Sequence, residues 1–534
     1  MKDSVAFELD GVAVTIERNG DSLLGALRDQ LGSTSVKDGC SPQGQCGCCT
    51  VLVDGAARVA CVTPAKRIAG RKVTTLDGVA PEKRQRWAEA FCATGASQCG
   101  FCTPGIIMRL EALSAKRLPD DEGPVKQALL AHLCRCTGWQ TIIEAWHRYH
   151  DGSPIDLSDR DFEAASQRAT LEGGTRQLVS TDVVLGSAGF AADTAPDDAL
   201  VAVRAATGDW VVADSLFDAR ALAGKVQGRR TTVEHGWPLD VPKGEWAATL
   251  RTTWVEPAYL ETDTSWATPD RTAYSPLANG GAFGAKLSSP VNAIAEELAQ
   301  KHQRPVVAVA SREDATVLGA KRPPVAGGIR PDGTGVIRVV STPGISEIIQ
   351  RVAPGLVVEE VDVDGPETSA DIRAAGWLEA MLLVSAVGGE QTESGSAGEG
   401  AVVDADSGWV QSPYGGSARA QVLTTAGKPR FLVSVRCGRV LDDVVLRSYC
   451  IGAAHMAWSW LRSEALTVDD EGAVHDLTVR SFGVIRAVDM PEVDVVLEED
   501  DGEPSNGSDA VFAAVAVAGW AAMSFPRDLP AQQA

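Results

Sequence analysis

The sequence predicts an α+β protein of several domains, and three observations support this fold class. The chain has 534 residues, enough for about three or four domains of roughly 100–200 residues each. Apolar and polar residues alternate through residues 5–17 around Asp10-Gly11, a dipeptide that favours the turn of a β-hairpin. The apolar spacing becomes helical from Pro81, and strand-like and helix-like patterns mix from Asp182 to the C-terminus.

Residues 1–79 are predicted to form a small ferredoxin-like β-grasp domain, because hairpin, helix, cysteine-bearing loop and second hairpin follow in that order. Asp21 or Ser22 can cap a short helix. The second hairpin turns at Asp54-Gly55 and ends at Cys61. The helix would bury the leucines at positions 23, 24, 27 and 31.

Residues 80–150 are predicted to form a helical bundle. Thr103-Pro104 is a favourable start for a helix. It places Cys99 and Cys102 just before the helix N-terminus, where backbone N–H groups and the positive end of the helix dipole favour a thiolate. The expected helices cover 81–91, 104–115, 124–133 and 141–150.

The rest of the chain is predicted to be a polar linker, residues 151–180, and a mixed α/β region, residues 181–534. Gly388–Gly400 and Glu498–Glu503 are expected to be solvated loops. The apolar run Val511–Met523 is shorter than the roughly 20 residues that span a bilayer. A buried helix is expected there.

Charge and cysteine content limit the classes of function. The formal net charge of −22 argues against nucleic acid or an anionic membrane surface as a partner. The chain begins MKDSVAFELD, without the apolar core of a secretory signal, so a cytoplasmic location is expected. Ten of the 12 cysteines lie between residues 40 and 136, a clustering that favours metal ligation in a reducing compartment over a disulfide framework.

Two sets of four cysteines are candidate metal ligands. Cys40, Cys46, Cys49 and Cys61 have the spacing C-x5-C-x2-C-x11-C, close to the C-x4-C-x2-C of plant-type 2Fe–2S ferredoxins. Cys48, within the first set, is expected to be a packed thiol. A four-cysteine zinc site tolerates similar spacings and remains the alternative for the first set. The second set combines a CxxC with a CxC: Cys99, Cys102, Cys134 and Cys136.

Three segments together resemble the iron–sulfur subunit of the molybdenum hydroxylase (xanthine dehydrogenase / aldehyde oxidase / carbon monoxide dehydrogenase) family. They are KDGCSPQGQCGCCTVLVDG, QCGFCTPGI and LCRCTGWQTIIEA, and the resemblance covers about residues 1–150. It implies one 2Fe–2S cluster on each cysteine set, and contact between Gln98 and the pterin of a molybdenum cofactor. The sequence departs from the family in the longer first spacing, in Cys48 (usually Ala) and in His132 (usually Asn).

The later region resembles a shortened molybdenum-binding subunit of the same family. The similar segments include TTWVEPAYLETD, with Glu256-Pro257, and NGGAFGAK at residues 279–286. In the second, Gly281, Phe283 and Gly284 are expected to approach a pterin, because glycine lets the backbone come close to a ligand. The family's catalytic glutamate aligns with Asp509, which is one methylene shorter, so an N-cap role is expected for Asp509 and no catalytic residue is assigned.

These observations lead to one main hypothesis. The chain is expected to be a 2Fe–2S electron-transfer subunit that receives electrons from a molybdopterin centre on a partner subunit and passes them to an FAD-binding subunit or another acceptor. Its C-terminal module would serve for docking. The alternatives are a self-sufficient molybdenum hydroxylase of reduced size and a non-redox structural or assembly metalloprotein.

Overall fold

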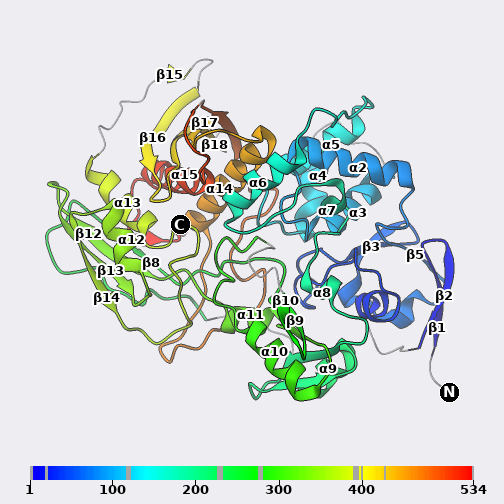
Figure 1. Ribbon diagram of the computed structural model, residues 1–534. Coiled ribbons are helices and arrows are strands. Elements are labelled where there is room, and N and C mark those ends of the chain that lie inside the picture. The colour runs from blue at the N-terminus through cyan, green and yellow to red at the C-terminus, as the bar shows by residue number, and fades with distance from the viewer. Residues whose placement is uncertain are drawn as a thin grey trace.

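The computed structural model describes residues 4–17, 22–115, 122–224, 233–274, 281–388, 396–397, 401–425, 428–498 and 500–531. Within these residues the strands form four five-stranded sheets, and helices pack between and around them (Figure 1). The predicted α+β multidomain class is therefore confirmed.

The first sheet contains both predicted hairpins. Asp10 and Gly11 have φ of 51° and 85°, and Asp54 and Gly55 have φ of 48° and 77°, the positive values that a tight hairpin turn requires. The sheet has the order β2-β1-β5-β3-β4, with β1 parallel to β5. Its strands are β1 Val5–Leu9, β2 Val12–Ile16, β3 Thr50–Val53, β4 Ala56–Val59 and β5 Lys72–Thr74.

A short helix follows the first hairpin, and Ser22 caps it by accepting a hydrogen bond from the backbone N–H of Gly25. This helix is α1, Leu23–Gly25, and a π-helical segment, Ala26–Gln30, continues it. Asp21, the other predicted cap, lies outside the described residues.

The four predicted helices of the second region are present with small shifts at their ends. Trp87 stacks on Tyr149 with the ring centroids 3.7 Å apart, which fixes the first of these helices against the last. They are α2 Pro81–Thr94, α3 Thr103–Ser114, α4 Gly123–Ala128 with a 3₁₀ turn Leu129–Ala131, and α5 Gln140–His150.

The interval 151–180, predicted as a linker, contains a packed helix, α6 (Phe162–Gly173). Asp161 caps it, and its inner face packs on α14 (Asp443–Arg462). That inner face carries Arg168 and Glu172, which form a fully buried ion pair. Because two charged residues occupy this buried face, residues 151–180 lack the apolar spacing that would have predicted a packed helix.

The second sheet, with the order β10-β9-β11-β6-β7, lies at the bottom of Figure 1. Its strands are β6 Leu200–Arg204, β7 Trp210–Ala213, β9 Thr264–Thr268, β10 Arg271–Tyr274 and β11 Val306–Val309. The helices of this part are α8 Ala191–Thr194, α9 Leu216–Ala223, α10 Val291–His302 and α11 Arg312–Leu318, whereas α7 Thr181–Val184 packs on α2 of the helical region.

The third sheet, β14-β13-β12-β8-β20, forms the left side of Figure 1. Its strands are β8 Ala248–Thr252, β12 Val325–Ile329, β13 Gly335–Val340, β14 Leu356–Val361 and β20 Asp528–Leu529. Two helices belong to it, α12 Ile345–Val352 and α13 Trp377–Gly388.

The fourth sheet, β15-β16-β17-β18-β19, packs on the long central helices α14 and α15 (Ser508–Ala522). The predicted buried helix over residues 511–523 corresponds to α15, which is apolar and almost entirely buried. None of the helices within the described ranges combines the length and apolarity needed to cross a membrane. The strands are β15 Ser396–Ala397, β16 Ala401–Gln411, β17 Ser417–Thr425, β18 Lys428–Arg436 and β19 Glu492–Leu497. Most of the predicted loop 388–400 lies outside the described residues.

Candidate functional site

The first cysteine set is gathered in the loop before β3 and in the turn after β4. All four thiols are buried, with exposures between 1% and 6%. The backbone N–H groups of Gln43 and Gln45 point at Cys40 Sγ at 3.2 and 3.4 Å. The N–H of Cys61 points at Cys49 Sγ at 3.4 Å. Such N–H···S contacts stabilise negative charge on sulfur.

The second cysteine set lies between the N-terminus of α3 and the start of α5. The Sγ atoms of Cys99 and Cys136 are 3.6 Å apart. Cys134 Sγ lies 3.1 Å from the hydroxyl of Thr137. The pKa of the Cys134 thiol is lowered to about 6, first by a hydrogen bond from Cys102 and then, against the effect of burial, by Thr137.

The arrangement of the thiols in the second set suits a binuclear cluster. Cys99 approaches Cys136, and Cys102 approaches Cys134. A structural zinc ion takes four ligands about a single point. A 2Fe–2S cluster held by four cysteines takes only two thiolates on each iron, so paired thiols fit it better.

The two cysteine sets lie side by side. The backbone N–H of Leu133, next to Cys134, donates to the carbonyl oxygen of Cys46 at 3.0 Å. A Cβ on Gly105 of α3 would collide with the carbonyl oxygen of Gly47, so α3 starts directly against the first loop. Cys48, predicted as a packed thiol, is buried at this junction. The close approach provides a short path between the two predicted clusters.

Gln98 faces its own chain. Its side chain is buried, and Nε2 donates to the carbonyl oxygen of Cys136 at 3.1 Å and to Ser448 Oγ of α14 at 3.0 Å. Its Oε1 has no hydrogen-bond partner among the described residues. The unpaired oxygen leaves one position for a donor, while α14 packs against the amide nitrogen.

The glycine-containing loop approaches the second cysteine set. A Cβ on Gly281 would lie 2.9 Å from Cys136 Sγ, and one on Gly284 would collide with the carbonyl oxygen of Asp371. Phe283 has φ of 44°, and the Arg373 guanidinium lies 3.8 Å from its ring centroid. The first two residues of the loop, 279 and 280, lie outside the described residues.

The space that the described residues leave beside Gln98 and Phe283 does not fit a molybdopterin. The cavity beside Gln98 has a volume of about 10 Å³, and the cavity beside Phe283 about 30 Å³. These volumes hold a water molecule or two, whereas pockets for organic cofactors enclose roughly 300–1,000 Å³. Gly452 of α14 also packs directly on the carbonyl oxygen of Cys136, where any side chain would collide.

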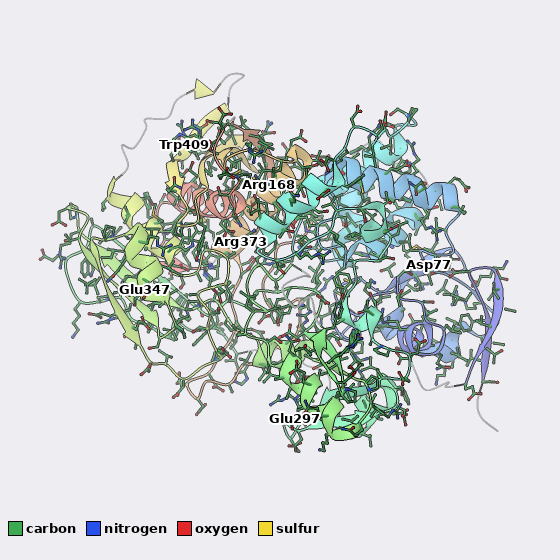
Figure 2. All side chains as sticks on the ribbon, in the orientation of Figure 1. Asp77, Arg168, Glu297, Glu347, Arg373 and Trp409 are labelled. Atoms are coloured by element: carbon green, nitrogen blue, oxygen red, sulfur yellow. The ribbon has the colours of Figure 1, made fainter. Side chains whose placement is uncertain are left out.

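Asp509 is held in a buried ion pair. Its Oδ1 lies 2.8 Å from Arg373 Nε, and Arg373 is labelled near the middle of the view in Figure 2. Its pKa is raised by burial, although Arg373 acts in the opposite direction. The predicted N-cap role is wrong, because Asp509 lies inside the first turn of α15 and its own N–H donates to Asn506 Oδ1.

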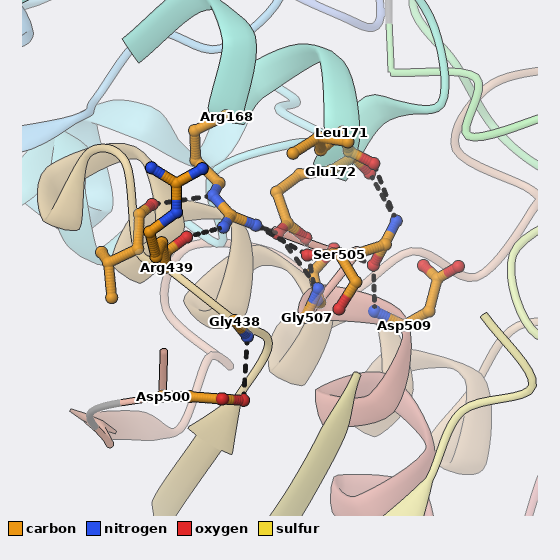
Figure 3. Close-up of polar contacts among 12 residues, drawn as sticks. Arg168, Leu171, Glu172, Gly438, Arg439, Asp500, Ser505, Gly507 and Asp509 are labelled. Atoms are coloured by element: carbon orange, nitrogen blue, oxygen red, sulfur yellow. Dashed lines mark hydrogen bonds and ion pairs between the residues drawn. The ribbon is translucent and has the colours of Figure 1, made fainter. Parts of the chain in front are cut away.

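Glu172 and Arg168 of α6 hold the turn before α15 (Figure 3). Glu172 accepts hydrogen bonds from the backbone N–H groups of Gly507 and Ser508, at 3.1 and 2.8 Å. Arg168 donates to the carbonyl oxygen of Ser505 at 2.7 Å. Neither residue was predicted from the sequence as part of a site; their i, i+4 spacing was the available signal.

A buried ion pair connects the cysteine region to the large C-terminal region. Arg135, between Cys134 and Cys136, makes a two-fold contact with Glu464 at 2.6 and 2.8 Å. A second buried pair lies within the C-terminal region, where Glu256 is 2.9 Å from Lys321. These side chains fill the interior with paired charges.

Comparisons with known proteins agree with this geometry. Residues 75–147 match a family model described as a [2Fe-2S] binding domain. The chain is 44% identical over 127 residues to the xanthine dehydrogenase iron-sulfur-binding subunit of Escherichia coli O157:H7, covering 23% of this chain and 79% of that protein. It is 40% identical over 147 residues to the nicotine 6-hydroxylase small subunit of Paenarthrobacter nicotinovorans, covering 26% of this chain and 88% of that protein.

Two comparisons with aldehyde oxidoreductases cover very different shares of the chain, one by sequence and one by structure. The chain is 39% identical over 142 residues to the aldehyde oxidoreductase of Megalodesulfovibrio gigas, which is 26% of this chain but only 16% of that protein. The solved aldehyde oxidoreductase structure from Desulfovibrio gigas aligns with 99% of both chains at a TM-score of 0.72 and 16% identity. At that identity the likeness shows the fold alone.

Proposed function

Because the chain belongs to the molybdenum hydroxylase family through its iron–sulfur region, we propose that it is the electron-transfer subunit of a heteromeric member. In this role it receives electrons from a molybdopterin centre on a partner subunit and passes them to an FAD-binding subunit or another acceptor. Electron transfer through 2Fe–2S clusters is a property of the family. What we propose is that this chain carries the clusters while a partner subunit carries the molybdopterin centre.

The residues proposed to hold the clusters are the two cysteine sets. Cys40, Cys46, Cys49 and Cys61 would hold one 2Fe–2S cluster, and Cys99, Cys102, Cys134 and Cys136 the other. When bound, each cluster accepts and releases one electron at a time. The chain's own contribution is to bury the thiols, direct backbone N–H groups at sulfur and place the N-terminus of α3 beside Cys102.

The main support for a molybdenum centre on a partner subunit is the lack of space for a molybdopterin among the described residues. α14 covers Gln98, and only about 30 Å³ remains beside Phe283. Arg373 holds Asp509 in an ion pair, so a free base is not presented there. A partner subunit would therefore supply the molybdenum centre, and the C-terminal region would act in docking.

A self-sufficient enzyme is the second candidate. The fold likeness to an aldehyde oxidoreductase over the whole chain and the placement of Gly281 beside Cys136 favour it. In that case Gln98, Gly281, Phe283 and Gly284 would contact a pterin after α14 had moved.

Purification of the native protein with its partners tests the proposal. We expect a complex that contains a second, molybdenum-bearing subunit and that loses its molybdenum with that subunit. A native protein that is catalytically complete without partners would contradict the proposal. A visible spectrum without reducible 2Fe–2S features would instead support a structural or assembly role.

A further inference from the structure

A cavity lies between the loop of the first cysteine set and the second sheet. Its volume is about 120 Å³, whereas one water molecule needs roughly 10–15 Å³. Asp38 and Ser41, which flank Gly39 and Cys40, line this cavity together with Val307 of β11. The cavity therefore borders the first predicted cluster and has room for a small organic molecule.

The two cationic side chains in its wall already have partners. Lys37 donates hydrogen bonds to the carbonyl oxygen of Gly186 at 2.7 Å and to Asp193 Oδ2. Arg28 donates to Asp193 Oδ1 at 2.8 Å, and its terminal N–H groups also reach three backbone carbonyl oxygens. Both oxygens of Asp193 are used in this way, so these three side chains satisfy one another.

Two other carboxylates in the wall each keep one oxygen without a partner among the described residues. Asp38 Oδ2 accepts a hydrogen bond from Arg220 at 2.9 Å, whereas its Oδ1 accepts none. Glu261 is 5% exposed, and Lys286 donates to its Oε2 at 3.0 Å, but no donor contacts its Oε1. Because a buried acceptor without a donor costs free energy, a ligand that donates hydrogen bonds would be stabilised here.

The surface that a ligand would meet is negatively charged. Arg220 and Lys286 pair with Asp38 and Glu261 from outside the lining. An excess of negative charge in a cavity attracts a cation and repels an anion. The charged residues of the lining are four carboxylates and two cations: Asp29, Asp38, Asp193, Glu261, Arg28 and Lys37.

The remaining wall is apolar. Phe101 and Phe190 meet edge to face with their ring centroids 5.0 Å apart. Val201, Leu216 and Val309 line the cavity as well. Apolar walls favour a ligand with a hydrocarbon part over a bare metal ion, and aromatic rings also attract organic cations.

We propose that this cavity binds a small organic ammonium ion with a short apolar body, and that the bound cation favours reduction of the first cluster. The N–H groups would donate to the unpaired oxygens of Asp38 and Glu261. The effect on reduction rests on the proposed function, because it needs a cluster on the first cysteine set. Reduction adds one electron, delivered from the molybdopterin centre, and no bond to the ammonium ion forms or breaks. A nearby positive charge stabilises the added negative charge, and by linkage reduction tightens binding by the same factor.

The test measures binding of n-butylammonium and n-butanol to the full, cluster-loaded chain by calorimetry. The two probes share the apolar body and differ in charge. We expect n-butylammonium to bind about tenfold or more tightly, as charge-assisted hydrogen bonds predict. Equal affinities, or no binding of n-butylammonium at millimolar concentration, would overturn the proposal.

Asp38→Asn removes the charge of one unpaired carboxylate. It should weaken binding of n-butylammonium about tenfold and leave binding of n-butanol unchanged. Asp54→Asn is the matched control, because Asp54 is a half-exposed carboxylate of the same domain that pairs with Arg71. Unchanged affinity in Asp38→Asn, or an equal loss in the control, would contradict the proposed site.

Leu216→Trp tests the site without changing a charge, because the larger side chain would fill the cavity. It should prevent binding of both probes. Leu222→Trp is its control, since Leu222 lies on the same helix, α9, and is 65% exposed. Undiminished binding in Leu216→Trp would place the probes elsewhere and overturn the proposal.

A redox titration followed by electron paramagnetic resonance provides a second readout. n-Butylammonium should raise the midpoint potential of one 2Fe–2S signal, and this shift should be absent with n-butanol and in Leu216→Trp. An unchanged potential with n-butylammonium bound would refute the effect on reduction. Calorimetry needs no redox step, so a chain that binds the probe but has no reducible cluster would contradict the proposed function and leave the binding site standing.

Discussion

Among single residues, the cysteine thiols matter most for the proposed clusters. Cys99 and Cys136 approach within 3.6 Å, and both are candidate ligands of the same cluster. A serine hydroxyl at either position is a poor ligand for iron compared with a thiolate. The two clusters should consequently respond separately to single substitutions.

We expect Cys99→Ser to abolish one of two distinguishable 2Fe–2S signals in electron paramagnetic resonance of the reduced protein. The other signal should persist, since Cys40, Cys46, Cys49 and Cys61 are untouched. Cys92→Ser is a matched control, because Cys92 is a buried thiol outside both sets. Two intact signals in Cys99→Ser would refute the ligand assignment.

A buried histidine gives the chain a pH dependence of stability. Burial in α14 lowers the pKa of His455 to about 3, below the value of about 6.5 in an unfolded chain. Between these values the unfolded state binds a proton that the folded state does not, so stability falls as the pH decreases. The expected loss is about 2 kcal/mol between pH 6.5 and 5.

His455→Gln should remove this contribution. We expect the melting temperature of the variant to depend less steeply on pH between 6.5 and 5 than that of the unchanged protein. His147, an exposed histidine on α5, offers the control substitution His147→Gln. Parallel pH profiles for His455→Gln and the unchanged protein would show that His455 does not titrate as the burial implies.

At the scale of elements, α14 connects the cysteine region to the C-terminal half. Ser448 contacts Gln98, Gly452 packs on Cys136, and Glu464, just beyond the helix, pairs with Arg135. Arg135 and Glu464 are 6% and 1% exposed. Removing one partner of such a buried pair leaves an uncompensated charge.

Glu464→Gln is therefore expected to destabilise the protein by about 3–5 kcal/mol. Glu359→Gln removes the partner of Arg338 in an exposed pair and should cost less than about 1 kcal/mol. Denaturant unfolding of the two variants measures the difference. Similar losses in both would mean that α14 is not held to the cysteine loop through this ion pair.

At the scale of the whole molecule, local patterns explain what the sequence could predict. Asp10-Gly11 and Thr103-Pro104 are short-range signals, and the hairpin and helix that they indicate are present. Arg373 and Asp509 are 136 positions apart and meet only in the folded chain, so no local pattern could pair them. α6 was missed because its buried face carries Arg168 and Glu172 in place of apolar residues.

The same distinction applies to the function. The cysteine spacing indicated the clusters, whereas the space available to a molybdopterin depends on how α14 packs. Gln98, Gly281 and Phe283 lie near the second cysteine set, yet the adjoining cavities are too small for the cofactor. The fold of an aldehyde oxidoreductase is thus combined with an interior filled by side chains.

Metal analysis of the chain purified alone tests the proposed function most directly. We expect about four iron atoms per chain, from two 2Fe–2S clusters, and no stoichiometric molybdenum. About one molybdenum per chain, with clusters that bleach when a substrate is added, would contradict the proposed function.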